Sequence, residues 1–208
     1  MDGLLRLKRS QVEDVTNMLV RAFVNDPLHL FYFPDINKRV QQIYHLMNYS
    51  IRYCMRYGEV YTTSSKLEGV ALWQLEGPIV EQGHGDKPMS LFVNWLLFRL
   101  WVGLGKALEK VISLYDYTVS IQHELVPSRH WYFFVLGVDP KFQGQGFASR
   151  LITPMVARID KEQLPCYLDT YNEKNVGLAQ HFGFKVVKRY QIPGSDVINW
   201  SMVRESPE

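Results

Sequence analysis

The chain has 208 residues, of which 47% are hydrophobic and 21% are charged, and its formal net charge is +2. This length suits a single domain over residues 1–208 that buries its own core, and the composition excludes an intrinsically disordered chain. The small net charge gives no indication of a nucleic-acid partner. The N-terminal residues lack the basic and apolar segments of a signal peptide, so we expect a cytoplasmic protein in which Cys54 and Cys166 are free thiols.

The first part of the chain predicts a strand, two helices and a β-hairpin. Ser10 and Glu13 have the S-x-x-E spacing of a capping box, and apolar residues recur at helical spacing from Val12 to Phe23. The expected elements are a strand at 4–8, helices at 10–24 and 36–57, and strands at 59–64 and 67–75.

The middle of the chain predicts a helical insertion at about residues 76–124. It begins with a glycine-containing loop and continues into 91–102, where Asn94 and Arg99 are the only strongly polar residues. A bilayer span needs about 20 apolar residues, so this segment is too short to cross a membrane. It is expected to face the protein core or a homodimer partner, with contact to a membrane surface as the alternative. An amphipathic helix is expected over 106–123.

The last third alternates between strands and helices. We expect strands at 130–138, 166–170, 184–192 and 197–203, with helices at 146–163 and 172–182. This alternation predicts an α/β fold with a mixed sheet and helices on both faces.

A glycine-containing loop joins the strand at 130–138 to the helix that follows it. Gly144 and Gly146 allow backbone N–H groups to converge, and the start of the helix adds its positive dipole end. This arrangement indicates a site for a phosphate or pyrophosphate. The alternative is an ordinary turn between a strand and a helix.

Two other phosphate-binding motifs fit this loop less well. A Rossmann fingerprint is supported by Gly144, Gly146 and Asp169, but Ser149 stands where its third glycine belongs. Residues 139–143 also separate the strand from the first glycine, and too little sequence follows for a doubly wound sheet. A P-loop is excluded, because no Gly-Lys-Ser/Thr sequence follows.

The loop resembles the GNAT superfamily of N-acetyltransferases. Gln143-Gly144-Gln145-Gly146-Phe147-Ala148 matches the family pattern Q/R-x-x-G-x-G/A, and Asn172 to Phe184 is similar to its N-x-x-A-x-x-L-Y-x-x-x-G-F signature. The likeness extends from Trp131 to about Lys188. It implies a GNAT-like fold, in which a central, mostly antiparallel sheet splays at a coenzyme A cleft and helices cover both faces.

The resemblance also implies the reaction and the cofactor-binding residues. The activity would be direct transfer of an acetyl group from acetyl-CoA to the amine of a small molecule or peptide. A backbone N–H near Leu136 would polarise the thioester carbonyl, and Asn172 would help to hold the pantetheine arm. The implied cofactor-binding residues are Leu136, Gly137 and Val138 at the strand end, Gln143, Gly144, Gln145, Gly146, Phe147 and Ala148 at the pyrophosphate, and Asn172. No cluster has metal-ligand spacing, so we expect no metal.

The catalytic acid and base are not identified by the resemblance. Ala179 stands where many family members carry the tyrosine that protonates the departing thiolate. The remaining candidates for proton transfer are His130, Tyr167, Tyr171 and Asp169, each of which also has a purely structural interpretation. Ala179 therefore keeps open a second hypothesis, a catalytically silent module that binds acyl-CoA as a sensor or interaction partner. The aromatic segment 29–34 would either wall an acceptor pocket or pack in the core.

Overall fold

The computed structural model describes residues 3–77, 100 and 102–206. In chain order its elements are β1 (Leu5–Arg6), the 3-10 turn η1 (Arg9–Gln11), α1 (Val12–Phe23), α2 (Pro27–Tyr32), α3 (Ile36–Tyr57), β2 (Glu59–Thr62), β3 (Gly69–Glu76), α5 (Ala107–Leu125), β4 (His130–Val138), the 3-10 turn η3 (Pro140–Phe142), α6 (Phe147–Glu162), β5 (Cys166–Thr170), α7 (Glu173–His181), β6 (Lys185–Gln191) and β7 (Ile198–Arg204).

The described strands form one sheet in the order β1-β2-β3-β4-β5-β7-β6. Neighbouring strands are antiparallel except β4 and β5, which are parallel. That parallel pairing covers only Trp131 with Cys166 and Tyr132 with Tyr167. Beyond Tyr132, β4 continues to Val138 and, among the described strands, pairs there only with β3. The sheet therefore splays between β4 and β5, and the predicted mixed, mostly antiparallel sheet is confirmed.

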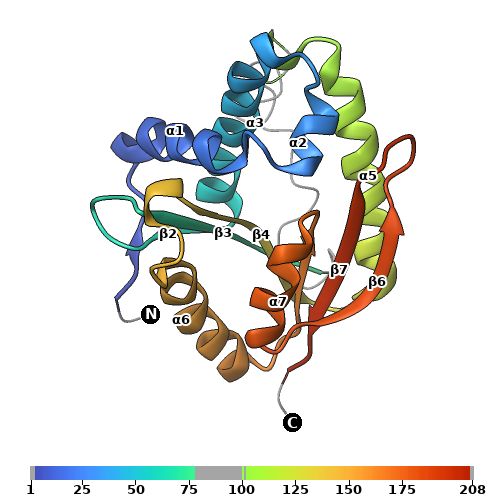
Figure 1. Cartoon of the computed structure of the whole chain (residues 1–208). Helices are drawn as coiled ribbons and strands as arrows, with labels where there is room; N and C mark the ends of the chain where they lie inside the picture. Colours follow the sequence, from blue (N-terminus) through green and yellow to red (C-terminus); the bar gives the residue numbers. More distant parts are fainter. Residues whose placement is uncertain (1–2, 78–99, 101, 207–208) are drawn as a thin grey trace.

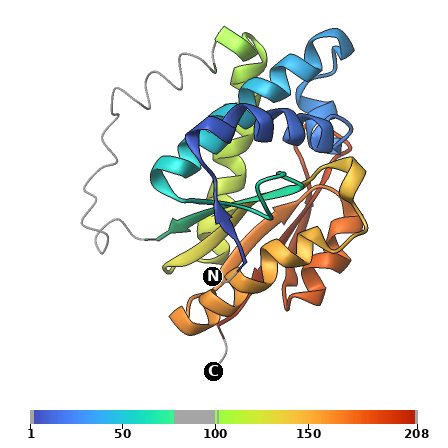
Figure 2. The same cartoon turned by 90° about the vertical axis from the view of Figure 1, so that its left-hand side faces the viewer.

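Helices cover both faces of this sheet, as Figure 1 and Figure 2 show. On one face, α1, α3 and α5 share a core with Val70 and Leu72 of β3. On the other face, α6 and α7 pack with Ala71 and Trp73, the residues that alternate with them along the same strand. The period-two alternation of β3 thus supplies both cores, because successive side chains of a strand point to opposite faces.

The start of α1 differs from the predicted capping box. The Lys8 N–H donates to Gln11 Oε1 at 3.0 Å, and η1 occupies Arg9–Gln11 before α1 begins at Val12. Ser10 lies inside this 3-10 turn rather than before the helix, so the pairing of Ser10 with Glu13 as a capping box was wrong. The extra turn moves the helix start past the residue that would have capped it.

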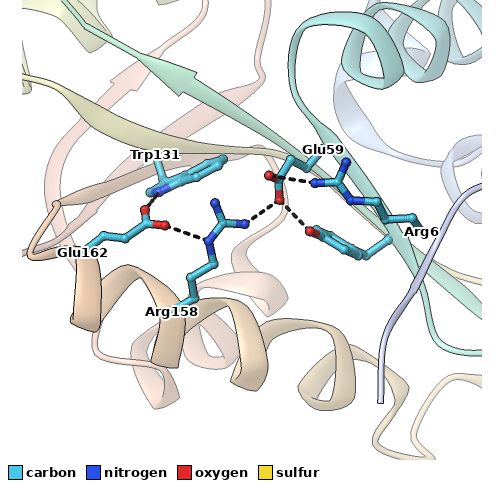
Figure 3. Close-up of polar contacts among 6 residues, drawn as sticks. Arg6, Glu59, Trp131, Arg158 and Glu162 are labelled. Carbon is cyan, nitrogen blue, oxygen red and sulfur yellow. Dashed lines mark hydrogen bonds and ion pairs between the residues drawn. The ribbon is translucent and has the colours of Figure 1, made fainter. Parts of the chain in front are cut away.

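A chain of ion pairs and hydrogen bonds fastens α6 to the β1–β2 edge of the sheet (Figure 3). Glu59 accepts from Arg6 Nη2 at 3.0 Å and from Arg158 Nη1 at 2.7 Å. Arg158 Nε also donates to Glu162, whose other oxygen accepts from Trp131 Nε1, both at 2.7 Å. The outer strands, β4 and α6 are therefore joined through charged groups as well as through the core.

The predicted insertion lies partly outside the described residues. Within 91–102, only residues 100 and 102 are described. Leu100 and Leu104 are buried in the same core as α1 and α3. The helix predicted at 106–123 is α5, Ala107–Leu125. In the described ranges, no helix combines the length and the apolar character needed to cross a membrane.

Candidate active site

The glycine loop leads directly into α6. Gly144 and Gly146 have φ values of +76° and +80°, and a Cβ at either position would meet nothing within 4 Å. Their conformation, rather than close packing, therefore requires glycine at both positions. The first i to i+4 hydrogen bond of α6 runs from the Arg150 N–H to the Gly146 carbonyl at 3.1 Å. Preceding N–H groups project from the helix start, where the macrodipole favours an anion.

Side chains hold this loop against the end of β4. Asp139 is buried, accepts from the Lys141 N–H at 3.1 Å and pairs with Arg21 Nη2 at 2.5 Å. Burial raises the pKa of Asp139, but the hydrogen bonds from Arg21 and Lys141 outweigh it and leave the pKa below the ordinary value. The amides of Gln143 and Gln145 donate to carbonyls of β4 and Lys141 at 3.1 and 3.2 Å. The loop is thus shaped without a ligand.

Two residues predicted at the end of β4, Leu136 and Gly137, have different surroundings. Leu136 lines a cavity at the splay, whereas Gly137 faces α1. A Cβ on Gly137 would lie 2.2 Å from Leu19 Cδ2, so the absence of a side chain allows α1 to approach β4. Beyond Tyr132, the edge of β4 that faces β5 is not bonded to it. An extended ligand with amide groups has an unpaired strand edge available there.

The splay opens into a cavity of about 260 Å³. Its wall combines residues of α1, α2, α3 and α5 with residues of β4, β5, α6 and α7. Of the residues predicted from the sequence, Leu136, Asp169, Tyr171 and Ala179 line it. Within the described ranges, its aromatic lining includes Tyr32, which belongs to the predicted segment 29–34, and Tyr115, Tyr132 and Phe134, which the sequence had not singled out as site residues.

Asp169 is the centre of a hydrogen-bond network beside this cavity. Its Oδ1 accepts from Tyr167 Oη at 2.6 Å and from Asn199 Nδ2 at 3.1 Å, with Ser201 Oγ at 3.5 Å. Its Oδ2 accepts from Tyr132 Oη at 3.0 Å. Burial raises the pKa of Asp169, and these donors only partly oppose the rise. The network orients the carboxyl group from β4, β5 and β7 together.

Two of the other proton-transfer candidates, His130 and Tyr167, do not line the cavity among the described residues. His130 is 1% exposed, and its ring nitrogens lie 2.7 Å from the Ser128 carbonyl oxygen and 2.9 Å from Gln122 Nε2. His130 is therefore a buried residue at the start of β4, and burial lowers its pKa. His130 and Tyr167 are not among the described residues that line the cavity, whereas Tyr171 is.

Asn172 has a structural role that the sequence did not predict. It is the N-cap of α7, and its Oδ1 accepts from the Lys174 N–H at 3.1 Å. The described cavity lining contains Asn175 instead, whose amide donates to Thr170 Oγ1 at 3.3 Å. Asn172 as a pantetheine contact stays a prediction.

The aromatic segment 29–34 includes both cavity wall and core. His29 and Tyr32 line the cavity, and Phe33 is 1% exposed in the core. His29 is itself buried, with Nδ1 3.5 Å from Asp26 Oδ1. The prediction that segment 29–34 could wall a pocket therefore included His29, whereas Asp26 was missed as a site residue.

The sequence of this chain is similar to those of acetyltransferases. Residues 70–184 match the family described as Acetyltransferase (GNAT) family. The chain is 26% identical over 186 residues to an uncharacterized N-acetyltransferase of Schizosaccharomyces pombe, covering 86% of this chain and 72% of that protein.

Solved structures of low sequence identity share the fold. A histone acetyltransferase HPA2 and related acetyltransferase from Corynebacterium glutamicum aligns with a TM-score of 0.66 at 18% identity, over 99% of this chain and 96% of that one. Arylalkylamine N-acetyltransferase 2 from Aedes aegypti gives a TM-score of 0.66 at 14% identity, over 98% of each chain.

Proposed function

Since the chain belongs to the GNAT family of N-acetyltransferases, we propose that it transfers an acetyl group from acetyl-CoA directly to the amine of a small molecule or peptide. One observation carries the proposal: the part of β4 that is unpaired with β5 lines the cavity through residues 133–136, and the same strand leads into the glycine loop at the start of α6. The loop suits a pyrophosphate, the edge suits the pantetheine amides, and the cavity suits the thioester and its acceptor.

In this reaction the amine nitrogen attacks the thioester carbonyl carbon, and the carbon–sulfur bond breaks. A backbone N–H near Leu136 supplies a hydrogen bond to the developing oxyanion. One proton of the ammonium ends on the coenzyme A sulfur and a second passes to solvent, so the charges balance. Ala179 lines the cavity but carries no acidic proton, so the thiolate takes its proton from water or from a neighbouring tyrosine.

A small amine is the acceptor class that we favour over a peptide. The aromatic lining and the cavity volume of about 260 Å³ support it. The structural neighbour from Aedes aegypti is named for arylalkylamines, and this supports the same class.

Thermal unfolding with acetyl-CoA, coenzyme A, NAD and NADP tests the donor. A ligand at about 100 times its dissociation constant adds about 2.7 kcal/mol of stability. We expect acetyl-CoA and coenzyme A to stabilise the protein and the dinucleotides to have no effect. Stabilisation by NAD or NADP alone would overturn the proposal. Thiol release with an amine panel then separates an enzyme from a silent acyl-CoA-binding module, which binds but does not turn over.

The pyrophosphate site has a matched pair of variants. Gly146→Ala and Gly194→Ala both place a Cβ at a positive φ (+80° and +72°) in open space. Each carries the same kind of backbone strain, but Gly194 lies in the β6–β7 turn. We expect only Gly146→Ala to weaken coenzyme A binding, measured by calorimetry. Equal weakening by both would assign the effect to general strain.

A further inference from the structure

The charged side chains in the described cavity wall are carboxylates. Among the described residues that line it are two carboxylates, Asp26 and Asp169, and no lysine or arginine. Asp26 is engaged locally, because its Oδ1 accepts from the Leu28 N–H at 3.0 Å and lies 3.5 Å from His29 Nδ1. Asp169 has only neutral donors around it, and within the described part of the chain no arginine or lysine pairs with it.

Asp169 is partly buried, and a carboxylate that is largely removed from water without a counter-ion is costly. Hydrogen bonds from neutral groups offset part of the desolvation free energy. A bound cation would offset more of it, because the carboxylate would then have a charged partner. The two carboxylate oxygens of Asp169 also accept different numbers of hydrogen bonds. Oδ1 accepts from Tyr167 and Asn199, whereas Oδ2 accepts from Tyr132 alone among the described residues. A carboxylate oxygen has room for a second donor, so Oδ2 can accept one from a ligand in the cavity.

The position of Asp169 matches the place where an acceptor nitrogen must arrive. The parallel register ends at Tyr132 with Tyr167, and if continued it sets Asp169 level with Phe134. Leu136 is two residues further along β4, roughly 7 Å at the rise of a strand. The rings of Tyr32, Tyr115 and Phe134 line the same cavity. Aromatic faces attract cations, and they also suit an apolar arm.

We propose that Asp169 binds the ammonium group of the acceptor, and that the acceptor is a primary amine carried on a compact aromatic or apolar arm. This inference rests on the proposed function and names the substrate class and the binding residue for it. Asp169 Oδ2 accepts a hydrogen bond from the ammonium and then takes its proton. The neutral amine attacks the thioester carbonyl carbon and the carbon–sulfur bond breaks. The second proton lost by the nitrogen ends on the coenzyme A sulfur, and Asp169 returns the first to solvent.

The variant Asp169→Asn removes the charge and the proton acceptor while keeping the shape. Its side-chain oxygen still accepts from Tyr167, and its amide reaches the Tyr132 hydroxyl. With phenethylamine as the probe, we expect kcat/KM to fall about 10- to 100-fold, since a hydrogen bond to a charged group is lost. The KM for acetyl-CoA should change by less than about twofold. Asp116→Asn makes the same substitution on the exposed face of α5 and should leave both constants unchanged.

A wild-type measurement keeps the inference testable if the variant does not fold. Phenethylamine and phenethyl alcohol have the same arm, but only the amine is charged. We expect phenethylamine to stabilise the wild-type protein against thermal unfolding and the alcohol to do so at least about tenfold more weakly in apparent affinity. Equal stabilisation by the two compounds, or an unchanged kcat/KM in a folded Asp169→Asn variant, would overturn the inference.

The outcomes also separate this inference from the proposed function. Failure of every amine to release thiol from bound acetyl-CoA would refute acetyl transfer, yet charge-selective stabilisation by phenethylamine that Asp169→Asn abolishes would still support Asp169 as an ammonium site. Conversely, acetyl transfer that is indifferent to Asp169 would leave the proposed function intact and refute the role of this residue.

Discussion

Gly137 determines how closely α1 approaches β4. An added Cβ would lie 2.2 Å from Leu19 Cδ2 and 3.4 Å from Phe23 Cε2. Because both neighbours are packed in the core, we expect Gly137→Ala to lower the free energy of unfolding by about 1–3 kcal/mol. Urea unfolding measures the loss, and Leu19→Ala in the same chain should restore part of it.

Gly177→Ala is the matched control for Gly137→Ala. Gly177 lies within α7, and a Cβ there would meet nothing within 4 Å. Alanine should therefore raise the free energy of unfolding by about 0.5–1 kcal/mol through helix propensity. A neutral effect at Gly137 would contradict the close approach of α1 to β4.

Asp169 should make stability depend on pH in a defined direction. Burial raises its pKa in the folded protein, so the folded state holds the proton more tightly than the unfolded chain. Its contribution is favourable below the ordinary carboxyl pKa and is lost as pH rises through the raised value. We therefore expect Asp169→Asn to gain stability relative to wild type as the pH rises above about 4, measured by urea unfolding without ligand. A difference between the two proteins that stays constant over this range would disprove the shift.

At the scale of elements, Glu59 joins α6 to the sheet edge. It accepts from Arg6, from Arg158 and from Tyr61 Oη, the last at 2.6 Å. Glu59→Gln leaves the two arginines facing each other without the carboxylate, so we expect a loss of about 1–2 kcal/mol in urea unfolding. The control is Glu124→Gln, because Glu124 is 66% exposed and pairs only with Lys188 among the described residues. Equal effects would show that the network adds nothing beyond an exposed pair.

Elements with strong local signals were predictable from the sequence. The bounds of α3, β4 and β5 are those expected, because Asp35 and Gly58 flank α3 and apolar residues fill both strands. The short helix α2 was missed, since six residues rich in aromatic side chains have no helical period to detect. Its start is nevertheless local: Asp26 caps it and proline occupies its first position.

At the scale of the whole molecule, the glycine loop was predictable, whereas most of the residues that line the cavity were not. Gly144 and Gly146 belong to one short motif, so the neighbouring residues suffice to predict the loop. The cavity instead brings Tyr32, Tyr115 and Tyr132 together from three elements. Tertiary packing alone makes Asp169 a partly buried carboxylate that has neutral donors and, among the described residues, no cation beside it. An isolated acid in a strand gives no such signal.

The splay between β4 and β5 predicts where acetyl-CoA will protect the backbone. Among the described strands, the β5-facing edge of β4 is unpaired beyond Tyr132, whereas residues 70–73 of β3 pair with β2 on one side and β4 on the other. We expect acetyl-CoA to slow amide exchange, followed by NMR, at least about tenfold in the gap-facing amides of 133–138 and in the loop at 143–148. Residues 70–73 should be unaffected, because their amides are already bonded. Protection confined to the loop would mean that only the pyrophosphate docks, and the strand edge would then have no role in binding the pantetheine arm.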